Sequence, residues 1–179
     1  MIRSALLALT LLAGCAGYVA PDPVRLPRDS VEGAGDPTRA AISRSAYAFA
    51  NQAALAGRPG EMARAIADME FLAAALPFDP RYQQRDPLLP WHLAQARAEW
   101  RGALGIAPDQ PAQPVIDALY AAARLSAKDG PAALAAGPLG PDRAARLAAM
   151  PPLPETARAA AAAARIQQEV QIPVRQWRR

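Results

Sequence analysis

The fold class is decided by residues 61–76, EMARAIADMEFLAAAL. The apolar residues of this stretch recur every three or four positions, which places them on one face of an α-helix: Met62, Ile66, Met69, Ala73 and Leu76. We expect the charged side chains of Glu61, Arg64 and Asp68 to lie outside this apolar face. Pro77 follows directly and ends the run, because proline cannot continue a helix. The stretch therefore predicts one amphipathic helix of about four turns.

Proline and glycine divide the rest of the chain into further segments of the same kind. Asp36 and Pro37 are typical of a helix start, and Gly57 and Pro59 of its end. The expected helices cover about 37–56, 61–76, 90–104, 114–128, 131–136, 141–150 and 155–171. No stretch alternates with a period of two, and about a quarter of the residues are alanine, the best helix former. We therefore predict an all-α, alanine-rich helical bundle or stacked helical hairpins, with about five to seven helices over residues 37–172.

Because alanine buries little area, a few large side chains must supply most of the core. We expect these anchors to be Phe49, Met69, Phe71, Leu72, Trp91, Trp100, Leu119 and Tyr120. Residues 47–55, the turn at 57–60 and the ending at 78–80 resemble one tetratricopeptide-type helical hairpin, over about 35 residues. No second copy follows at the period of roughly 34 residues typical of that family. A generic helical hairpin explains the same residues.

The first fifteen residues have the pattern of a signal peptide. Arg3 precedes an apolar run of about a dozen residues, which is too short to span a bilayer. The run ends in Leu12-Ala13-Gly14-Cys15, which resembles the lipobox of bacterial lipoproteins, and Cys15 is the only cysteine. The resemblance implies that residues 1–14 are a lipoprotein signal peptide and that Cys15 carries a diacylglycerol and an N-acyl chain. The alternative is an ordinary secretory signal that leaves Cys15 as a free thiol.

The resemblance also implies a location on the membrane. Two or three acyl chains hold a protein on a bilayer, whereas a single chain anchors it only marginally. In Gram-negative lipoproteins an aspartate after the cysteine tends to retain the protein in the inner membrane; Ala16 occupies that place here and favours the outer membrane, facing the periplasm. We interpret residues 15–36 as the lipidated cysteine and a flexible tether, because they are rich in proline and glycine and poor in large apolar side chains.

The net charge of +4 is confined to the two ends of the chain. Residues 15–174 contain 16 basic and 16 acidic side chains, so we expect no nucleic-acid partner for the body. Residues 173–179 form a basic C-terminal tail whose candidate contacts with anionic surfaces are Arg175, Trp177, Arg178 and Arg179. The alternative is a tail that serves only as a solubilising end.

Residues 77–90 contain four prolines and show no helical period, so they predict a loop. Together with the residue that follows, this loop contains the candidate interaction surface: Phe78, Arg81, Tyr82, Arg85 and Trp91. Tyrosine, tryptophan and arginine dominate the binding energy of protein interfaces. The alternative is that the three aromatic side chains fold back to cover the ends of helices.

Catalytic and metal-binding patterns are sparse. His92 is the only histidine, and it shares a helix face with Gln95 and Glu99. Zinc sites normally gather three or four ligands in recognisable pairs, and neither HExxH nor CxxC is present. Asp68 and Glu70 are two positions apart on a helix and should face different directions. No phosphate-binding glycine loop occurs, so we expect no cofactor, no metal and no catalytic residue.

The leading functional hypothesis is therefore a lipid-anchored periplasmic helical module that acts in protein–protein interaction or envelope assembly, with an envelope protein as its partner. A carrier that holds a small apolar or lipid ligand between the helices is the alternative. An enzyme or metal site built on His92 comes third.

Overall fold

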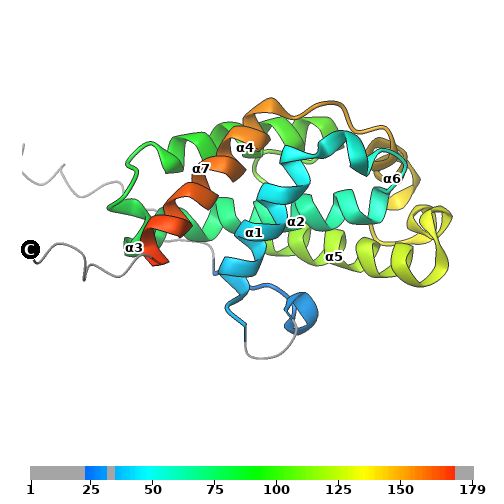
Figure 1. Ribbon diagram of the computed structural model, residues 1–179. Coiled ribbons are helices and arrows are strands. Elements are labelled where there is room, and N and C mark those ends of the chain that lie inside the picture. The colour runs from blue at the N-terminus through cyan, green and yellow to red at the C-terminus, as the bar shows by residue number, and fades with distance from the viewer. Residues whose placement is uncertain (1–22, 32–34, 172–179) are drawn as a thin grey trace, which may run out of the picture.

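The computed structural model describes residues 23–31 and 35–171. The regular structure in this part of the chain consists of helices without any strand, which confirms the all-α prediction (Figure 1). Its α-helices are α1 (Pro37–Ala50), α2 (Pro59–Ala75), α3 (Pro80–Gln83), α4 (Leu89–Leu104), α5 (Ala112–Asp129), α6 (Gly140–Ala148) and α7 (Pro154–Gln171). Short 3-10 helices lie between them: η2 (Arg28–Ser30), η3 (Gln52–Leu55), η4 (Leu76–Phe78) and η5 (Pro131–Ala136). No helix in the described residues is long and apolar enough to cross a membrane.

The helices pack around α2. Helices α1, α2, α4 and α7 form a ring in which each contacts the next, and α5 covers α2 from the outside (Figure 1). Helix α6 and η5 close one end, where both contact α2. Gly60 allows α2 and α5 to come very close, because a Cβ atom added there would lie 2.4 Å from the Cβ of Ser126. Small side chains thus permit the close packing that an alanine-rich core requires.

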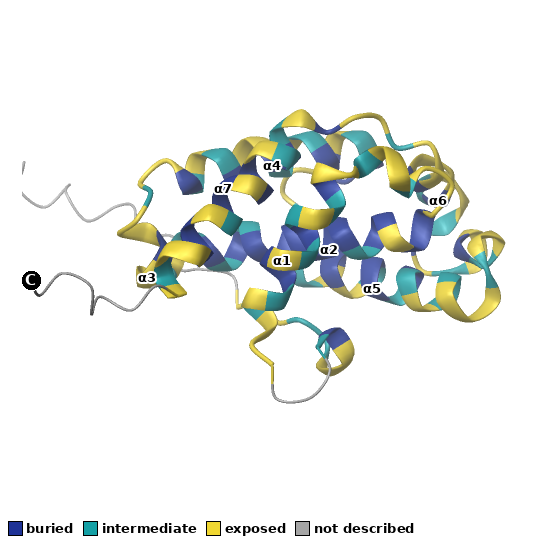
Figure 2. Cartoon of the chain, in the orientation of Figure 1, coloured by how far each residue is buried: buried dark blue, intermediate teal, exposed yellow. Residues whose placement is uncertain are grey.

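Helix α2 is more deeply buried than its sequence predicts. Much of α2 is dark blue in Figure 2, which marks buried residues. The expected apolar face is present, but Asp68 and Glu70 are also fully buried. The expectation that Asp68 lies away from the core is therefore wrong. Neighbouring helices enclose α2 on several sides, so only Glu61 and part of Arg64 remain exposed among its charged residues. Both buried carboxylates need partners, because an unpaired charge in an apolar interior is very unfavourable.

The expected core anchors are confirmed with one exception. Trp100 on α4 and Tyr120 on α5 are buried. The other confirmed anchors are Phe49, Met69, Phe71, Leu72 and Leu119. Trp91, at the start of α4, is 57% exposed and is not a core residue. The predicted cap of α1 is present, since the Asp36 carboxylate accepts hydrogen bonds from the backbone N–H groups of Thr38 and Arg39. The N-cap of α1 was therefore predictable from the sequence.

Two segments differ from the predicted loop and tether. Residues 77–90 form η4, α3 and the first turn of α4 rather than one irregular loop. Residues 23–31 pack on the body, with Val24 and Leu26 against the core and Ser30 buried. The folded body therefore includes residues 23–31, which precede the expected start at residue 37. We call residues 23–31 the N-terminal strap; the expected signal peptide, the lipid site and the first part of the expected tether lie outside the described residues.

Candidate functional site

The residues predicted as an interaction surface divide into exposed and buried groups. Phe78 and Trp91 are 45% and 57% exposed, and Arg85 is exposed as well. Arg81 is exposed but its guanidinium binds the Asp79 carboxylate at 2.7 Å, which lowers the pKa of that carboxyl. Tyr82 is buried, where its hydroxyl donates a hydrogen bond to the Gln167 side chain on α7. The alternative of folding back over the helices is therefore correct for Tyr82, and that residue is not a surface contact.

An apolar groove adjoins the exposed aromatic residues. It has a volume of about 620 Å³ and lies between the end of α2, η4, α4 and residues 106–108. Phe78 and Pro90 line one part, and Ala94, Ala98 and Gly102 of α4 form a wall of small exposed residues. We call this feature the α4 groove. Among the described residues, its only charged lining residues are Arg97 and Arg101.

Glu70 joins those two arginines beneath the α4 groove. Its Oε1 atom accepts hydrogen bonds from Arg97 Nε at 2.9 Å and from Arg101 Nη2 at 2.5 Å. Its Oε2 atom accepts from the indole N–H of Trp100 at 2.8 Å. Arg101 also donates to the carbonyls of residues 107 and 108, which fixes the chain after α4. Two guanidinium groups therefore share one carboxylate, which leaves a net positive charge at the base of the groove.

Asp68 is the centre of a second buried network. Both of its oxygens accept from Arg44, at 2.8 and 2.9 Å, and Oδ1 also accepts from the Tyr120 hydroxyl at 2.5 Å. Burial raises the pKa of Tyr120, so this hydroxyl stays protonated and acts as a donor. Arg44 donates a further bond to the Ser30 carbonyl at 2.8 Å. The network thus joins α1, α2, α5 and the N-terminal strap.

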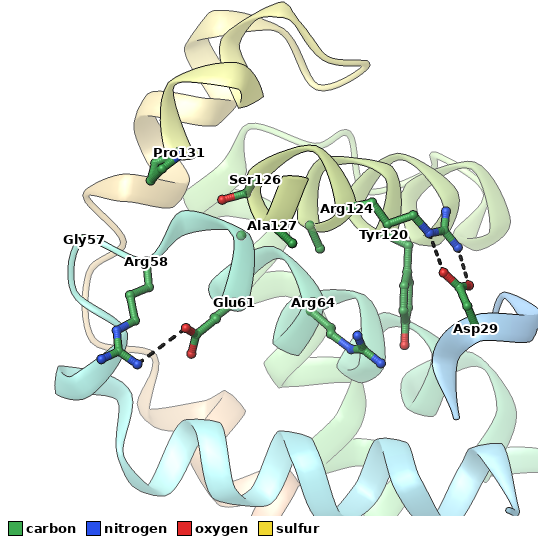
Figure 3. A pocket seen from close by; sticks show the side chains of 12 residues that line it. Asp29, Gly57, Arg58, Glu61, Arg64, Tyr120, Arg124, Ser126, Ala127 and Pro131 are labelled. Carbon is green, nitrogen blue, oxygen red and sulfur yellow. Dashed lines mark hydrogen bonds and ion pairs between the residues drawn. The ribbon is translucent and has the colours of Figure 1, made fainter. Parts of the chain in front are cut away.

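A second pocket lies between α2 and α5, beside the N-terminal strap (Figure 3). It has a volume of about 380 Å³, and we call it the α2–α5 pocket. Its charged lining residues are Asp29, Arg58, Glu61, Arg64 and Arg124. Arg124 binds Asp29 through two nitrogens, and this hydrogen bonding lowers the pKa of the Asp29 carboxyl. Three cationic groups thus face two carboxylates in this pocket.

His92 lies apart from both features. It is partly buried, and its ring packs edge-to-face on Trp91 with 5.0 Å between ring centres. Glu99, which shares its helix face, accepts hydrogen bonds from the backbone N–H groups of Glu155 and Thr156 at the start of α7. No group of three or more histidine, cysteine or carboxylate side chains that could hold a metal ion occurs in the described residues.

Sequence reasoning missed the two buried networks, although one signal for them was present. Asp68 and Glu70 stand in the most continuously apolar helix of the chain, where a charge requires a partner. The remaining predicted site residues, Cys15 and the four of the C-terminal tail, lie outside the described residues. Comparison of the chain with known protein families, curated proteins and solved structures finds no match.

Proposed function

We propose that this protein is a lipid-anchored module of the Gram-negative envelope that binds a partner protein through the α4 groove. The lipobox-like residues Leu12-Ala13-Gly14-Cys15 support the anchor, and Ala16 supports an outer-membrane location facing the periplasm. The acyl chains on Cys15 would hold the body at the membrane surface. The module performs its role by binding rather than by catalysis.

The observation that carries this proposal is the exposed apolar surface around the α4 groove. Three large apolar residues with 45–60% exposure lie between η4 and the first turn of α4: Phe78, Leu88 and Trp91. Phe78 lines the α4 groove itself, and exposed apolar side chains at a groove are typical of a protein interaction site. Aromatic side chains at its edge can bury large areas in a partner at a small entropic cost.

The charges that line the α4 groove indicate which chemical groups the partner protein presents to it. In the part of the chain that the structure describes, the charged groups that line the α4 groove are Arg97 and Arg101, and Glu70 neutralises one of these two charges. Arg97 is 28% exposed in its side chain, so its guanidinium is within reach of a bound chain. We infer that the partner inserts an apolar segment along the alanine wall of α4 and places a carboxylate against Arg97. Such a charge-assisted contact would fix the orientation of the segment.

The lipid anchor is tested with Cys15→Ser. The parent protein is expected in the membrane fraction with an acylated N-terminal peptide in mass spectra, and the variant is expected to be soluble or unprocessed. Membrane fractionation that does not change in Cys15→Ser would contradict the anchor.

The groove is tested with a photo-crosslinking residue placed at Ala94 in living cells, followed by binding measurements with the purified crosslinked partner. Ala98→Glu puts a bulky anion on the groove wall and should weaken this binding at least tenfold. Ala161→Glu is the matched control, because Ala161 is an exposed alanine on α7, away from the groove. Equal binding by the two variants would refute the groove as the contact surface.

The size of the α4 groove also favours the second hypothesis, a carrier of a small apolar ligand. A volume of about 620 Å³ is within the range of small-molecule sites. Native mass spectrometry of protein extracted from its own membrane would detect such a ligand as a bound mass. Ala98→Glu should then remove that mass, whereas Ala161→Glu should keep it.

A further inference from the structure

The α2–α5 pocket contains an arginine whose charge no described carboxylate neutralises. Arg64 makes no ion pair within the described residues, whereas Arg124 and Arg58 pair with Asp29 and Glu61. Its Nη2 atom donates to the Ser30 carbonyl at 3.0 Å, and its buried Nε atom has no hydrogen-bond acceptor there. A partly buried guanidinium without an ion pair favours binding of an anion, because the anion supplies the missing counter-charge.

Tyr120 holds this arginine in place. The Arg64 guanidinium carbon lies 5.5 Å from the centre of the Tyr120 ring, and Arg124 lies 6.0 Å from the same centre (Figure 3). The ring itself is fixed by the hydrogen bond from its hydroxyl to Asp68. The guanidinium is therefore held between a rigid aromatic ring and the strap carbonyl before any ligand arrives. Such preorganisation reduces the entropy lost on binding.

Two further arginines lie beside the same ring. Arg44 and Arg124 also approach Tyr120, but Arg44 pairs with Asp68 and Arg124 pairs with Asp29. Of the three arginines around Tyr120, only Arg64 makes no ion pair within the described residues. An arginine fork matches the oxygens of a phosphate group.

We propose that the α2–α5 pocket is a phosphate-binding site in which Arg64 is the main ligand. Its volume of about 380 Å³ leaves room for a substituted phosphate such as a phospholipid headgroup, as well as for a free phosphate. The assignment of a phospholipid headgroup as the source of the phosphate rests on the proposed function, in which Cys15 is lipidated. Only seven residues separate the strap from Cys15, and that stretch of chain can span at most about 28 Å. A body anchored through Cys15 therefore keeps the strap and the adjoining pocket near the headgroups.

The test uses the full chain carrying Cys15→Ser, so that binding does not depend on acylation. Inorganic phosphate is titrated by calorimetry and thermal shift against chloride of equal ionic strength. We expect saturable binding that raises Tm and that Arg64→Gln weakens at least tenfold. Arg165→Gln is the charge-matched control, because Arg165 is exposed on α7 and pairs with Asp86. The phosphate affinity of this variant should stay within twofold of that of the parent.

A second variant tests the pocket independently, in case Arg64→Gln loses phosphate binding because it folds poorly. Ala127 is an exposed residue that lines the pocket, so Ala127→Glu adds a competing carboxylate without removing any contact of Arg64. Phosphate binding should fall at least tenfold in this variant, while its far-UV circular dichroism matches the parent. Phosphate affinity that is the same in the parent, Arg64→Gln and Ala127→Glu would overturn the proposal, as would the absence of saturable binding to the parent.

Vesicles distinguish the two sources of phosphate. Phosphatidylglycerol vesicles are compared with vesicles of an uncharged glycolipid that contains no phosphate, in the same Cys15→Ser background. If the protein binds only the phosphatidylglycerol vesicles, and this binding requires Arg64, the ligand of the pocket is a phospholipid headgroup. If phosphate binding requires Arg64 but vesicle binding does not, the ligand is a free phosphate. If the lipid anchor is absent, only the membrane fractionation of Cys15→Ser shows it. That result is therefore distinguishable from failure of the phosphate site.

Discussion

Removal of the Glu70 carboxylate should strongly destabilise the fold. Glu70 is fully buried and accepts hydrogen bonds from Arg97, Trp100 and Arg101. Glu70→Ala leaves the Arg101 guanidinium, which is 3% exposed in its side chain, without its counter-charge. Removal of one partner from a buried ion pair costs about 3–5 kcal/mol. For a chain of this length each kcal/mol lowers Tm by about 2–4 °C, so we expect a loss of at least about 6 °C.

The assay is reversible urea unfolding followed by circular dichroism and by tryptophan fluorescence. Glu61→Ala is the matched control on the same helix, because Glu61 is exposed and pairs with Arg58 at 3.4 Å; its cost should be below about 1 kcal/mol. The double change Glu70→Leu with Arg101→Met should recover part of the lost stability, since it removes both buried charges. A cost below about 1 kcal/mol for Glu70→Ala would refute the conclusion that this carboxylate stabilises the α2–α4 contact.

Three further changes test other contacts. Trp100→Ala should cost about 3–5 kcal/mol, because it leaves a cavity in the core, and an unfolding curve identical to the parent's would show that Trp100 does not stabilise the core. Gly60→Ala should cost about 1–3 kcal/mol through the clash with Ser126, and Ser126→Gly should restore part of this stability in urea unfolding; no restoration would contradict the close contact. Asp29 has a lowered pKa through its hydrogen bonds from Arg124, so the pair stabilises the fold above the ordinary aspartate pKa of 3.8 and its contribution, below about 1 kcal/mol, is lost as pH falls through the lowered pKa. Arg124→Gln should raise this pKa in an NMR titration, and an unchanged value would argue against the pair.

The helices were predictable because they depend on neighbours in the chain. The predicted ranges 90–104 and 155–171 differ by one residue at one end from α4 and α7. Spacing of apolar residues, the Asp36 cap and the positions of proline and glycine were sufficient for this result. The surface position of Phe78 was also consistent with the predicted interaction segment, since proline-rich connections usually run over the surface.

The burial of Tyr82 and the exposure of Trp91 were not predictable in the same way. Both residues are aromatic and stand nine positions apart in one segment. Tyr82 is buried because Gln167, 85 residues later, brings a hydrogen-bond partner on α7. Trp91 is 57% exposed in the first turn of α4. The packing of α7 decided the burial of Tyr82, and no local pattern encodes that packing.

The sequence by itself determined the all-α class, most helix boundaries and the buried position of Trp100, because helix formation and apolar spacing are local properties. Only the tertiary structure decided the pairing of Asp68 with Arg44 and of Glu70 with Arg97 and Arg101, across 24 to 31 positions. Those partners meet because of how α1 and α4 are rotated and placed against α2. Helix orientation depends on the packing of the whole core, so the candidate binding sites became visible only with the folded chain.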